Sequence, residues 1–204
     1  GARTCRSRRG AGGVPVIFVL AIAVGYLIGS INPAAIIARL RGVDYRSVGS
    51  GNPGATNIGR AMGRKTGILV GVLDVLKGFL PALGFSLWTG DIAVAEVAGF
   101  AAVVGHITSP FLKGRGGKGV ATSAGAILAI EPIWLVPVLV VFGVAFKLSR
   151  RMGIASVSAA LTLIPASLIW NSDPSEILFG CAMALLIVLR HQSNIRSAIA
   201  TRLK

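Results

Sequence analysis

The residues best suited to chemistry lie in one polar run, residues 49–60, within a chain that is otherwise strongly apolar. The run combines four glycines, two asparagines, a serine, a threonine and Arg60. Lipid offers no hydrogen-bond partner to exposed backbone, so such a run beside a hydrophobic segment is expected to line a polar pocket. Glycine amides approach an anion closely, and the guanidinium of Arg60 offers a planar fork of donors to phosphate or carboxylate. The run therefore predicts an anion-binding pocket.

Two further polar clusters, residues 116–119 (GGKG) and 190–194 (RHQSN), support this prediction. The GGKG cluster lacks the earlier glycine and the following Ser or Thr of a nucleotide-binding P-loop, so no nucleotide site is predicted. It retains flexible amides, Lys118 and the start of a helix at Val120, whose dipole favours an anion. The sequence leaves two interpretations of this cluster: an anion site, or a positively charged tight turn.

Four of the ionisable residues within the apolar segments or at their ends are candidates for chemistry. His191 has Asn194 one helical turn away, so it either positions a hydroxyl or a phosphate, or anchors the interface. For His106, which ends the third apolar segment, a hydrogen-bonded anchor is the simpler interpretation. Asp74 and Lys77 are helical neighbours at a spacing of three, so they form a structural ion pair or present Lys77 to an anionic ligand.

The composition predicts that the membrane is the solvent of this protein. Of its 204 residues, 53% are hydrophobic and 14% charged, with a mean hydropathy of +0.76. A span needs about 20 residues, so we expect an all-α integral membrane protein with about seven transmembrane helices, some short or partly inserted. The apolar stretches are residues 14–38, 67–87, 92–105, 120–130, 132–146, 154–170 and 177–189.

The expected domain organisation is a single transmembrane domain over residues 14–196. A basic tail, residues 1–13, precedes it, and a basic cytoplasmic tail, residues 197–204, follows. The first tail and the apolar run after it resemble a signal peptide, but no small-residue cleavage site is evident, so a retained first span is expected.

The distribution of basic residues predicts the topology. The net charge of +14 forms no continuous stripe and accompanies no nucleic-acid-binding motif, so a nucleic-acid partner is not expected. Basic loops instead alternate with loops poor in Lys and Arg, and the positive-inside rule places the basic loops in the cytoplasm. All three polar clusters then lie on the cytoplasmic side, where they can form one site.

Neither a metal ion nor a cofactor is expected. The sequence has no paired Cys or His at metal-ligand spacing, no nucleophile elbow and no acidic cluster for magnesium. Cys5 and Cys181 lie too far apart in the sequence to suggest a disulfide framework.

The polar clusters resemble the three signature motifs of the bacterial acyl-phosphate-dependent glycerol-3-phosphate acyltransferases. The resemblance implies a seven-span inner-membrane enzyme that transfers a fatty acyl group from acyl phosphate to the first hydroxyl of glycerol 3-phosphate. Lysophosphatidate and phosphate would be the products, in the first step of phospholipid synthesis. The motifs are residues 49–60, 116–122 and 190–195, and the likeness extends to residues 26–30, 42–46 and 73–78.

The resemblance also implies the site residues and the partners. The expected partners are acyl phosphate, glycerol 3-phosphate, membrane lipid and the soluble enzyme that makes acyl phosphate. The catalytic residues expected are Ser50, Arg60, His191 and Asn194. The substrate-binding residues expected are Ser30, Asn52, Thr56, Asn57, Lys77, His106, Arg115, Gly116, Gly117, Lys118, Gly119 and Ser156.

The chemistry is consistent with these residue types. An acyl phosphate is already activated, so positioning and electrostatic stabilisation suffice without a protein nucleophile or a metal. We expect His191 to take or orient the proton of the attacking hydroxyl, with a substrate phosphate oxygen as the competing base.

The chain departs from the family pattern in two places. Ser109 stands where the family has proline, with Pro110 one position late, and Gly114 and Arg115 replace its Phe-Lys pair. The paired serines after the fifth span appear as Gly153 and Ser156, so one hydroxyl is missing.

Two other functional classes remain open at this point. A transporter of a phosphorylated or anionic solute would also use a cationic pocket between helices. A non-catalytic relative of the family would keep the motifs without acyl transfer.

Overall fold

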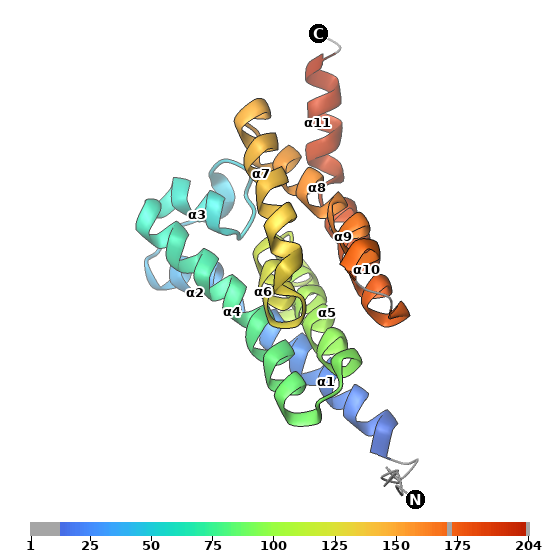
Figure 1. Cartoon of the computed structure of the whole chain (residues 1–204). Coiled ribbons are helices and arrows are strands. Elements are labelled where there is room, and N and C mark those ends of the chain that lie inside the picture. The colour runs from blue at the N-terminus through green and yellow to red at the C-terminus, as the bar shows by residue number, and fades with distance from the viewer. Residues whose placement is uncertain (1–12, 171–172, 203–204) are drawn as a thin grey trace, which may run out of the picture.

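The computed structural model describes residues 13–170 and 173–202, which form helices joined by short turns (Figure 1). The predicted all-α class is confirmed. The main helices are α1 (Gly13–Ser30), α2 (Pro33–Leu40), α3 (Ala55–Met62), α4 (Arg64–Thr89), α5 (Ile92–Thr108), α6 (Val120–Ile130), α7 (Leu135–Ser149), α8 (Met152–Leu161), α9 (Leu163–Trp170), α10 (Pro174–Arg190) and α11 (Gln192–Arg202). Single 3-10 turns occur at Tyr45–Ser47, Pro110–Leu112 and Pro132–Trp134.

Five helical segments of the described residues are long and apolar enough to cross a membrane. They are Pro15–Leu40, Arg64–Thr89, Ile92–Leu112, Pro132–Ser149 and Met152–Trp170. The other two stretches are shorter: α6 has 11 residues and α10 has 17. At a rise of about 1.5 Å per residue, α6 is too short to cross the hydrocarbon core alone. The five long apolar segments make this an integral membrane protein. A total of seven spans stays a prediction.

The first apolar stretch is not the one continuous segment expected over residues 14–38. It divides into α1 and α2 because Pro33 has no backbone N–H, and because the side chain of Asn32 caps α2 by accepting from the Ala35 N–H at 2.9 Å. The carbonyl of Ile31, freed at this break, accepts from Nζ of Lys77 at 2.9 Å. A buried lysine thus holds the junction of two helices.

The expected domain organisation stays a prediction, and its boundaries can be placed relative to the helices. The proposed boundary after residue 196 falls inside α11, which continues to Arg202. The expected basic tail, residues 1–13, lies outside the described residues except for Gly13, where α1 begins.

Four helices, α1, α4, α5 and α6, pack closely through small residues, and we call them the core wall. A β-carbon added at Gly29 of α1 would lie 2.0 Å from the carbonyl oxygen of Ala102 in α5. One added at Gly125 of α6 would lie 1.9 Å from the carbonyl oxygen of Val75 in α4. Such backbone contact is how helices associate tightly in lipid, where apolar side chains gain little from leaving it.

The helix α7, which we call the outer wall, is attached differently. None of its residues, all of which the structure describes, is buried. In the apolar window of Pro132–Ser149 6% of the residues are buried inside the protein, against 67% for the window in Ile92–Leu112. Figure 1 shows α7 running beside α6 and turning into α8. The space between the outer wall and the core wall holds the candidate site.

Candidate active site

The three polar clusters surround one cavity of about 930 Å³. They come from α3 and the loop before it, from the loop between α5 and α6, and from the junction of α10 with α11. Most of the site residues predicted from the sequence are among its lining. These are Ser50, Asn52, Thr56, Asn57, Arg60, His106, Lys118, Gly119, Ser156, His191 and Asn194.

The polar run of residues 49–60 first makes a tight loop and then forms α3. Gly49 and Gly51 have φ values of +55° and +63°, which favour glycine because a β-carbon is strained there. The buried side chain of Asn57 holds the loop: its Oδ1 accepts from the Ser50 N–H at 3.0 Å, and its Nδ2 donates to the carbonyl of Tyr45 at 2.9 Å. Asn57 therefore shapes the loop with both ends of its amide.

In the GGKG cluster, the two adjacent glycines lie outside the cavity lining. The N–H of Gly116 donates to the carbonyl of Ile107 at 3.0 Å, and that of Gly117 donates to the carbonyl of His106 at 3.1 Å. A β-carbon at residue 117 would lie 1.9 Å from Nε2 of His106. These glycines were predicted to bind phosphate, but the structure places them where they attach the loop to the end of α5.

The second half of this cluster faces the cavity. Lys118 and Gly119 line it, as do Val120 and Ala121 of the first turn of α6. The N-terminal end of α6 therefore points its dipole and free N–H groups at the cavity, beside the ammonium of Lys118. Arg115, also a predicted ligand, is exposed and lies outside the lining.

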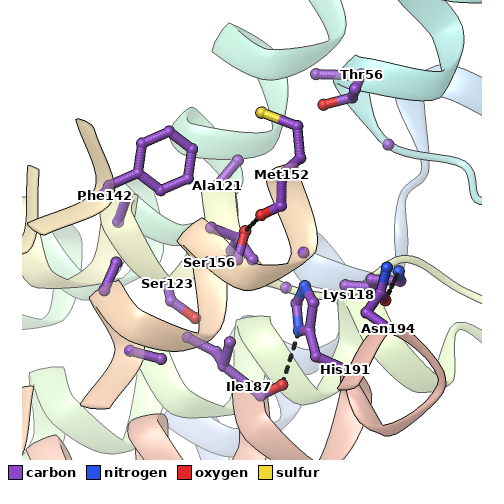
Figure 2. Close-up of a pocket in the computed structure, with 18 of the residues that line it drawn as sticks. Thr56, Lys118, Ala121, Ser123, Phe142, Met152, Ser156, Ile187, His191 and Asn194 are labelled. Carbon is purple, nitrogen blue, oxygen red and sulfur yellow. Dashed lines mark hydrogen bonds between the residues drawn. The ribbon is translucent and has the colours of Figure 1, made fainter. Parts of the chain in front are cut away.

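The third cluster joins the second through a hydrogen bond. Nζ of Lys118 donates to Oδ1 of Asn194, and Figure 2 shows the two side chains meeting beside His191. Nδ1 of His191 lies 2.8 Å from the carbonyl oxygen of Ile187. Because a carbonyl only accepts, Nδ1 carries a proton, and in the neutral imidazole Nε2 then keeps a free lone pair. In its neutral form, His191 therefore offers Nε2 as a hydrogen-bond acceptor.

The electrostatic surroundings favour this neutral form. Burial lowers the pKa of His191 below its usual 6.5, the hydrogen bond to Ile187 opposes this shift, and the positive charges of Lys118 and Arg190 add to it. Burial also lowers the pKa of Lys118, and the charge of Arg190 contributes. Both side chains therefore give up a proton at a lower pH than they would in water. A bound phosphate would raise the pKa of Lys118 again, because its negative charge favours the ammonium form.

Two predicted ligands in the spans have polar partners within the protein. Nζ of Lys77 lies 3.0 Å from Oδ1 of Asp74, as the spacing of three predicted, and both side chains are buried. The hydroxyl of Ser30 donates to the carbonyl of Tyr26 at 2.7 Å. Neither Lys77 nor Ser30 belongs to the cavity lining, whereas Asp74 and His106 do. Nδ1 of His106 lies 3.6 Å from Oδ1 of Asp74.

The two departures from the family pattern each have a local partner. The hydroxyl of Ser109 donates to the carbonyl of Ser30 at 2.7 Å, so it ties the end of α5 to the end of α1. A β-carbon at Gly153 would lie 2.6 Å from Nδ2 of Asn194. The missing side chain at residue 153 therefore makes room for the carboxamide of Asn194.

The sequence interpretation missed the apolar half of the cavity. One face of α7 lines it, at a helical spacing of three to four residues, and two arginines of the α7–α8 turn line it as well. Because α7 is apolar on every side, its sequence contains no stripe that would have indicated which face lines a cavity. The residues are Leu135, Val138, Leu139, Phe142, Phe146, Arg150 and Arg151.

The donor set suits anions rather than a metal ion. Within residues 13–170 and 173–202, no group of three or more His, Cys, Asp or Glu side chains is placed to hold a metal. The cavity instead combines cationic side chains, a helix N-terminus and a neutral imidazole at one end with an apolar face at the other. Such a cavity can bind a phosphorylated molecule together with an aliphatic chain.

Comparison with known protein families shows which family this chain belongs to. Residues 19–201 match the family model described as glycerol-3-phosphate acyltransferase. The chain belongs to that family. This acyltransferase is 42% identical over 183 residues to glycerol-3-phosphate acyltransferase 1 of Deinococcus radiodurans, with 87% of the chain and 90% of the relative covered. It is 38% identical to the enzyme of Endomicrobium trichonymphae, covering 90% and 93%.

A solved structure agrees with the sequence comparison. The acyltransferase described here superposes on the crystal structure of PlsY (YgiH), an integral membrane glycerol 3-phosphate acyltransferase, in its glycerol 3-phosphate form, with a TM-score of 0.86 and 37% identity. The match covers 91% of this chain and 93% of that one. The chain is thus a membrane glycerol-3-phosphate acyltransferase of the PlsY type, and its activity belongs to phospholipid synthesis.

Proposed function

We propose that this acyltransferase uses acyl phosphate as its donor and acylates the sn-1 hydroxyl of glycerol 3-phosphate. The observation that carries the proposal is that one cavity joins an anion-binding end, around Lys118 and Asn194, to an apolar face of α7. An acyl phosphate has both parts, a phosphate and an aliphatic chain, joined at the reacting carbonyl. The products are 1-acyl-glycerol 3-phosphate and inorganic phosphate.

The reaction needs little chemical assistance from the protein. The hydroxyl oxygen of glycerol 3-phosphate forms a bond to the acyl carbon, the bond from that carbon to the phosphate oxygen breaks, and the hydroxyl proton leaves. The mixed anhydride is already activated, so the protein contributes alignment of the reactants and cationic stabilisation of the developing negative charge. Arg60, Lys118 and the N-terminal end of α6 supply that stabilisation, while Ser50 and Asn194 orient the reacting groups.

The proton acceptor is Nε2 of His191 or an oxygen of a substrate phosphate. His191 is suited to the role because its Nδ1 donates to Ile187, which directs the lone pair of Nε2 away from that carbonyl. Replacing His191 by Gln removes this base but keeps a polar side chain. Retained turnover assigns the proton to the phosphate, and a large loss of kcat is expected if the imidazole accepts the proton or orients the hydroxyl.

The apolar half of the cavity is the site for the acyl chain. Leu135 and Phe146, at the two ends of the lining face of α7, are eleven residues apart, which corresponds to about 16 Å along the helix axis. Val138, Leu139 and Phe142 continue the same face between them. A saturated chain lying along α7 would leave contact with lipid for contact with these side chains.

Seven of the remaining predicted ligands are proposed in two roles. Asn52, Thr56, Gly119 and Ser156 line the cavity and are proposed to contact substrate. Lys77, Gly116 and Gly117 are proposed to act through the elements that they hold in place. The site is proposed to open to the cytoplasm at the inner membrane, where the soluble enzyme that makes acyl phosphate can supply the donor.

The deciding experiment is acyl transfer by the purified protein in detergent or bilayers, with radiolabelled glycerol 3-phosphate and either palmitoyl phosphate or palmitoyl coenzyme A. Labelled 1-acyl product from palmitoyl phosphate alone is the expected result. Product from palmitoyl coenzyme A alone would overturn the proposed donor. Folded protein that forms no product with either donor would be a non-catalytic relative of the family.

A further inference from the structure

Two arginines of the turn between α7 and α8 line the cavity without belonging to any of the three polar clusters. Arg150 and Arg151 are both exposed and both lie in the lining, close in sequence to Phe146 and Met152. The ordinary explanation of such residues is a basic cytoplasmic loop. Lys147, one turn earlier, fits that explanation because it is exposed and lies outside the lining.

The backbone of Arg150 is unusual for an arginine. Its φ is +54°, in the left-handed region, and its N–H donates to the carbonyl of Phe146 at 2.8 Å to close the end of α7. Glycine is the common residue at this place in a helix end, since a β-carbon costs about 1 kcal/mol there. A strained residue in a cavity lining is a reason to ask what its side chain does.

The position of this turn relative to the outer wall suggests an answer. The lining face of α7 begins at Leu135 and ends at Phe146, and the two arginines follow at the end of the same helix. An apolar strip that ends in two guanidinium groups matches an amphiphile with an aliphatic tail and an anionic head. Guanidinium groups bind phosphate through paired donors, and cations are favoured at a helix C-terminus.

The other cations of the cavity lie on different elements. Arg60 lies in the last turn of α3, and Lys118 precedes α6 and donates to Asn194. Both substrates of the proposed reaction carry phosphate, and two phosphates repel each other unless separate cations neutralise them. If Arg60 and Lys118 together hold one phosphate, the second phosphate needs the two further cations that line the cavity, those of the α7–α8 turn.

We infer that Arg150 and Arg151 form a second anion site, which binds the phosphate of the acyl donor while its chain lies along α7. This inference rests on the proposed use of acyl phosphate. The cations around Lys118 then hold the phosphate of glycerol 3-phosphate. The donor is guided along the outer wall, head and tail together, and the two phosphates occupy opposite parts of one cavity.

The test measures the KM of each substrate in Arg150→Gly, Arg151→Gln and the double variant, with Lys147→Gln as the matched control. Glycine suits the left-handed backbone at residue 150, so Arg150→Gly removes the guanidinium without disturbing the turn. Removal of one exposed charge–phosphate contact is expected to raise the KM for palmitoyl phosphate roughly five-fold, with little change in the KM for glycerol 3-phosphate. Lys147→Gln should leave both values unchanged.

A binding measurement separates this inference from the proposed function. Hexadecylphosphonate has the same head and tail but no acyl group to transfer, so calorimetry reports its affinity even for protein that does not turn over. Weaker binding in the Arg150 and Arg151 variants supports the site whatever the donor proves to be. Unchanged affinity in both variants, or an equal rise in the KM for glycerol 3-phosphate, overturns it.

Discussion

The two walls of the cavity are built on different physical principles. In the core wall, helix backbones touch at small residues, as Gly29 of α1 and Gly125 of α6 illustrate. In the outer wall, α7 has no buried residue along its described length and presents one apolar face to the cavity. The loop that contains Lys118 is attached to the core wall, through the backbone hydrogen bonds of Gly116 and Gly117 to the end of α5. The wall that meets an aliphatic chain needs no such precision, since apolar contact is non-directional.

The comparison predicts opposite responses to the same substitution in the two walls. Gly125→Ala places a β-carbon against the backbone of Val75, so the unfolding free energy should fall by about 3 kcal/mol or more. Gly143 lies in α7, where the described residues leave open space around an added β-carbon. Gly143→Ala should therefore stabilise the helix by about 0.5–1 kcal/mol. Thermal unfolding in detergent measures both, and equal shifts would mean that the two walls do not differ in packing.

The second prediction concerns the groups that the core wall positions. Lys118→Met removes the ammonium beside the N-terminal end of α6 and its hydrogen bond to Asn194. Loss of one such stabilising donor should lower kcat/KM about 100-fold, with little change in the unfolding temperature. Lys65, an exposed lysine in the first turn of α4, provides the control. If Lys65→Met reduced the rate as much, the effect would be one of surface charge rather than of the cavity.

Much of the core wall could be predicted from the sequence because its signals are local or follow from simple rules. The spacing of Asp74 and Lys77 predicted neighbours on one helix face, and the two side chains form an ion pair. The alternation of basic and neutral loops predicted that the three polar clusters share one side, and all three contribute to one cavity. Polar residues in a membrane protein are rare enough that their positions carry information.

The remaining features depend on contacts that a single sequence does not reveal. Gly116 and Gly117 were expected to hold phosphate, but they pack on His106, a residue ten or more positions away. The break between α1 and α2 was missed because the apolar character continues across Asn32 and Pro33. The lining face of α7 was missed because every face of that helix is apolar.

The third prediction tests a tight contact of α8, the helix that follows the outer wall in the chain. Gly153 of α8 follows α7 closely in the chain, and an added β-carbon would meet the carboxamide of Asn194. Because the end of a side chain can move, Gly153→Ala should cost little stability but displace the partner of Lys118. We expect kcat/KM to fall roughly ten-fold. Its effect should shrink in an Asn194→Ala background, where the smaller side chain leaves room; additive effects in this double-mutant cycle would contradict the contact.

The smallest expected effect concerns pH and is carried by a residue outside the cavity lining. The charge of Arg190 contributes to lowering the pKa of both His191 and Lys118. With the charge of Arg190 present, the pKa of the His191 imidazole lies below its usual 6.5, and the pKa of the Lys118 ammonium lies below its usual 10.5. Arg190→Gln should therefore raise both pKa values and move both limbs of the profile of kcat/KM against pH upward, while Arg190→Lys should leave them in place.

This shift also bears on the choice of base. If His191 accepts the proton, the acidic limb reports the loss of its free lone pair, and that limb moves with the charge at residue 190. If a substrate phosphate is the base, the acidic limb follows the ionisation of the phosphate and persists in His191→Gln. A profile whose acidic limb ignores both substitutions would exclude the imidazole as the proton acceptor. It would leave His191, held by the carbonyl of Ile187 in α10, with the role of orienting the hydroxyl.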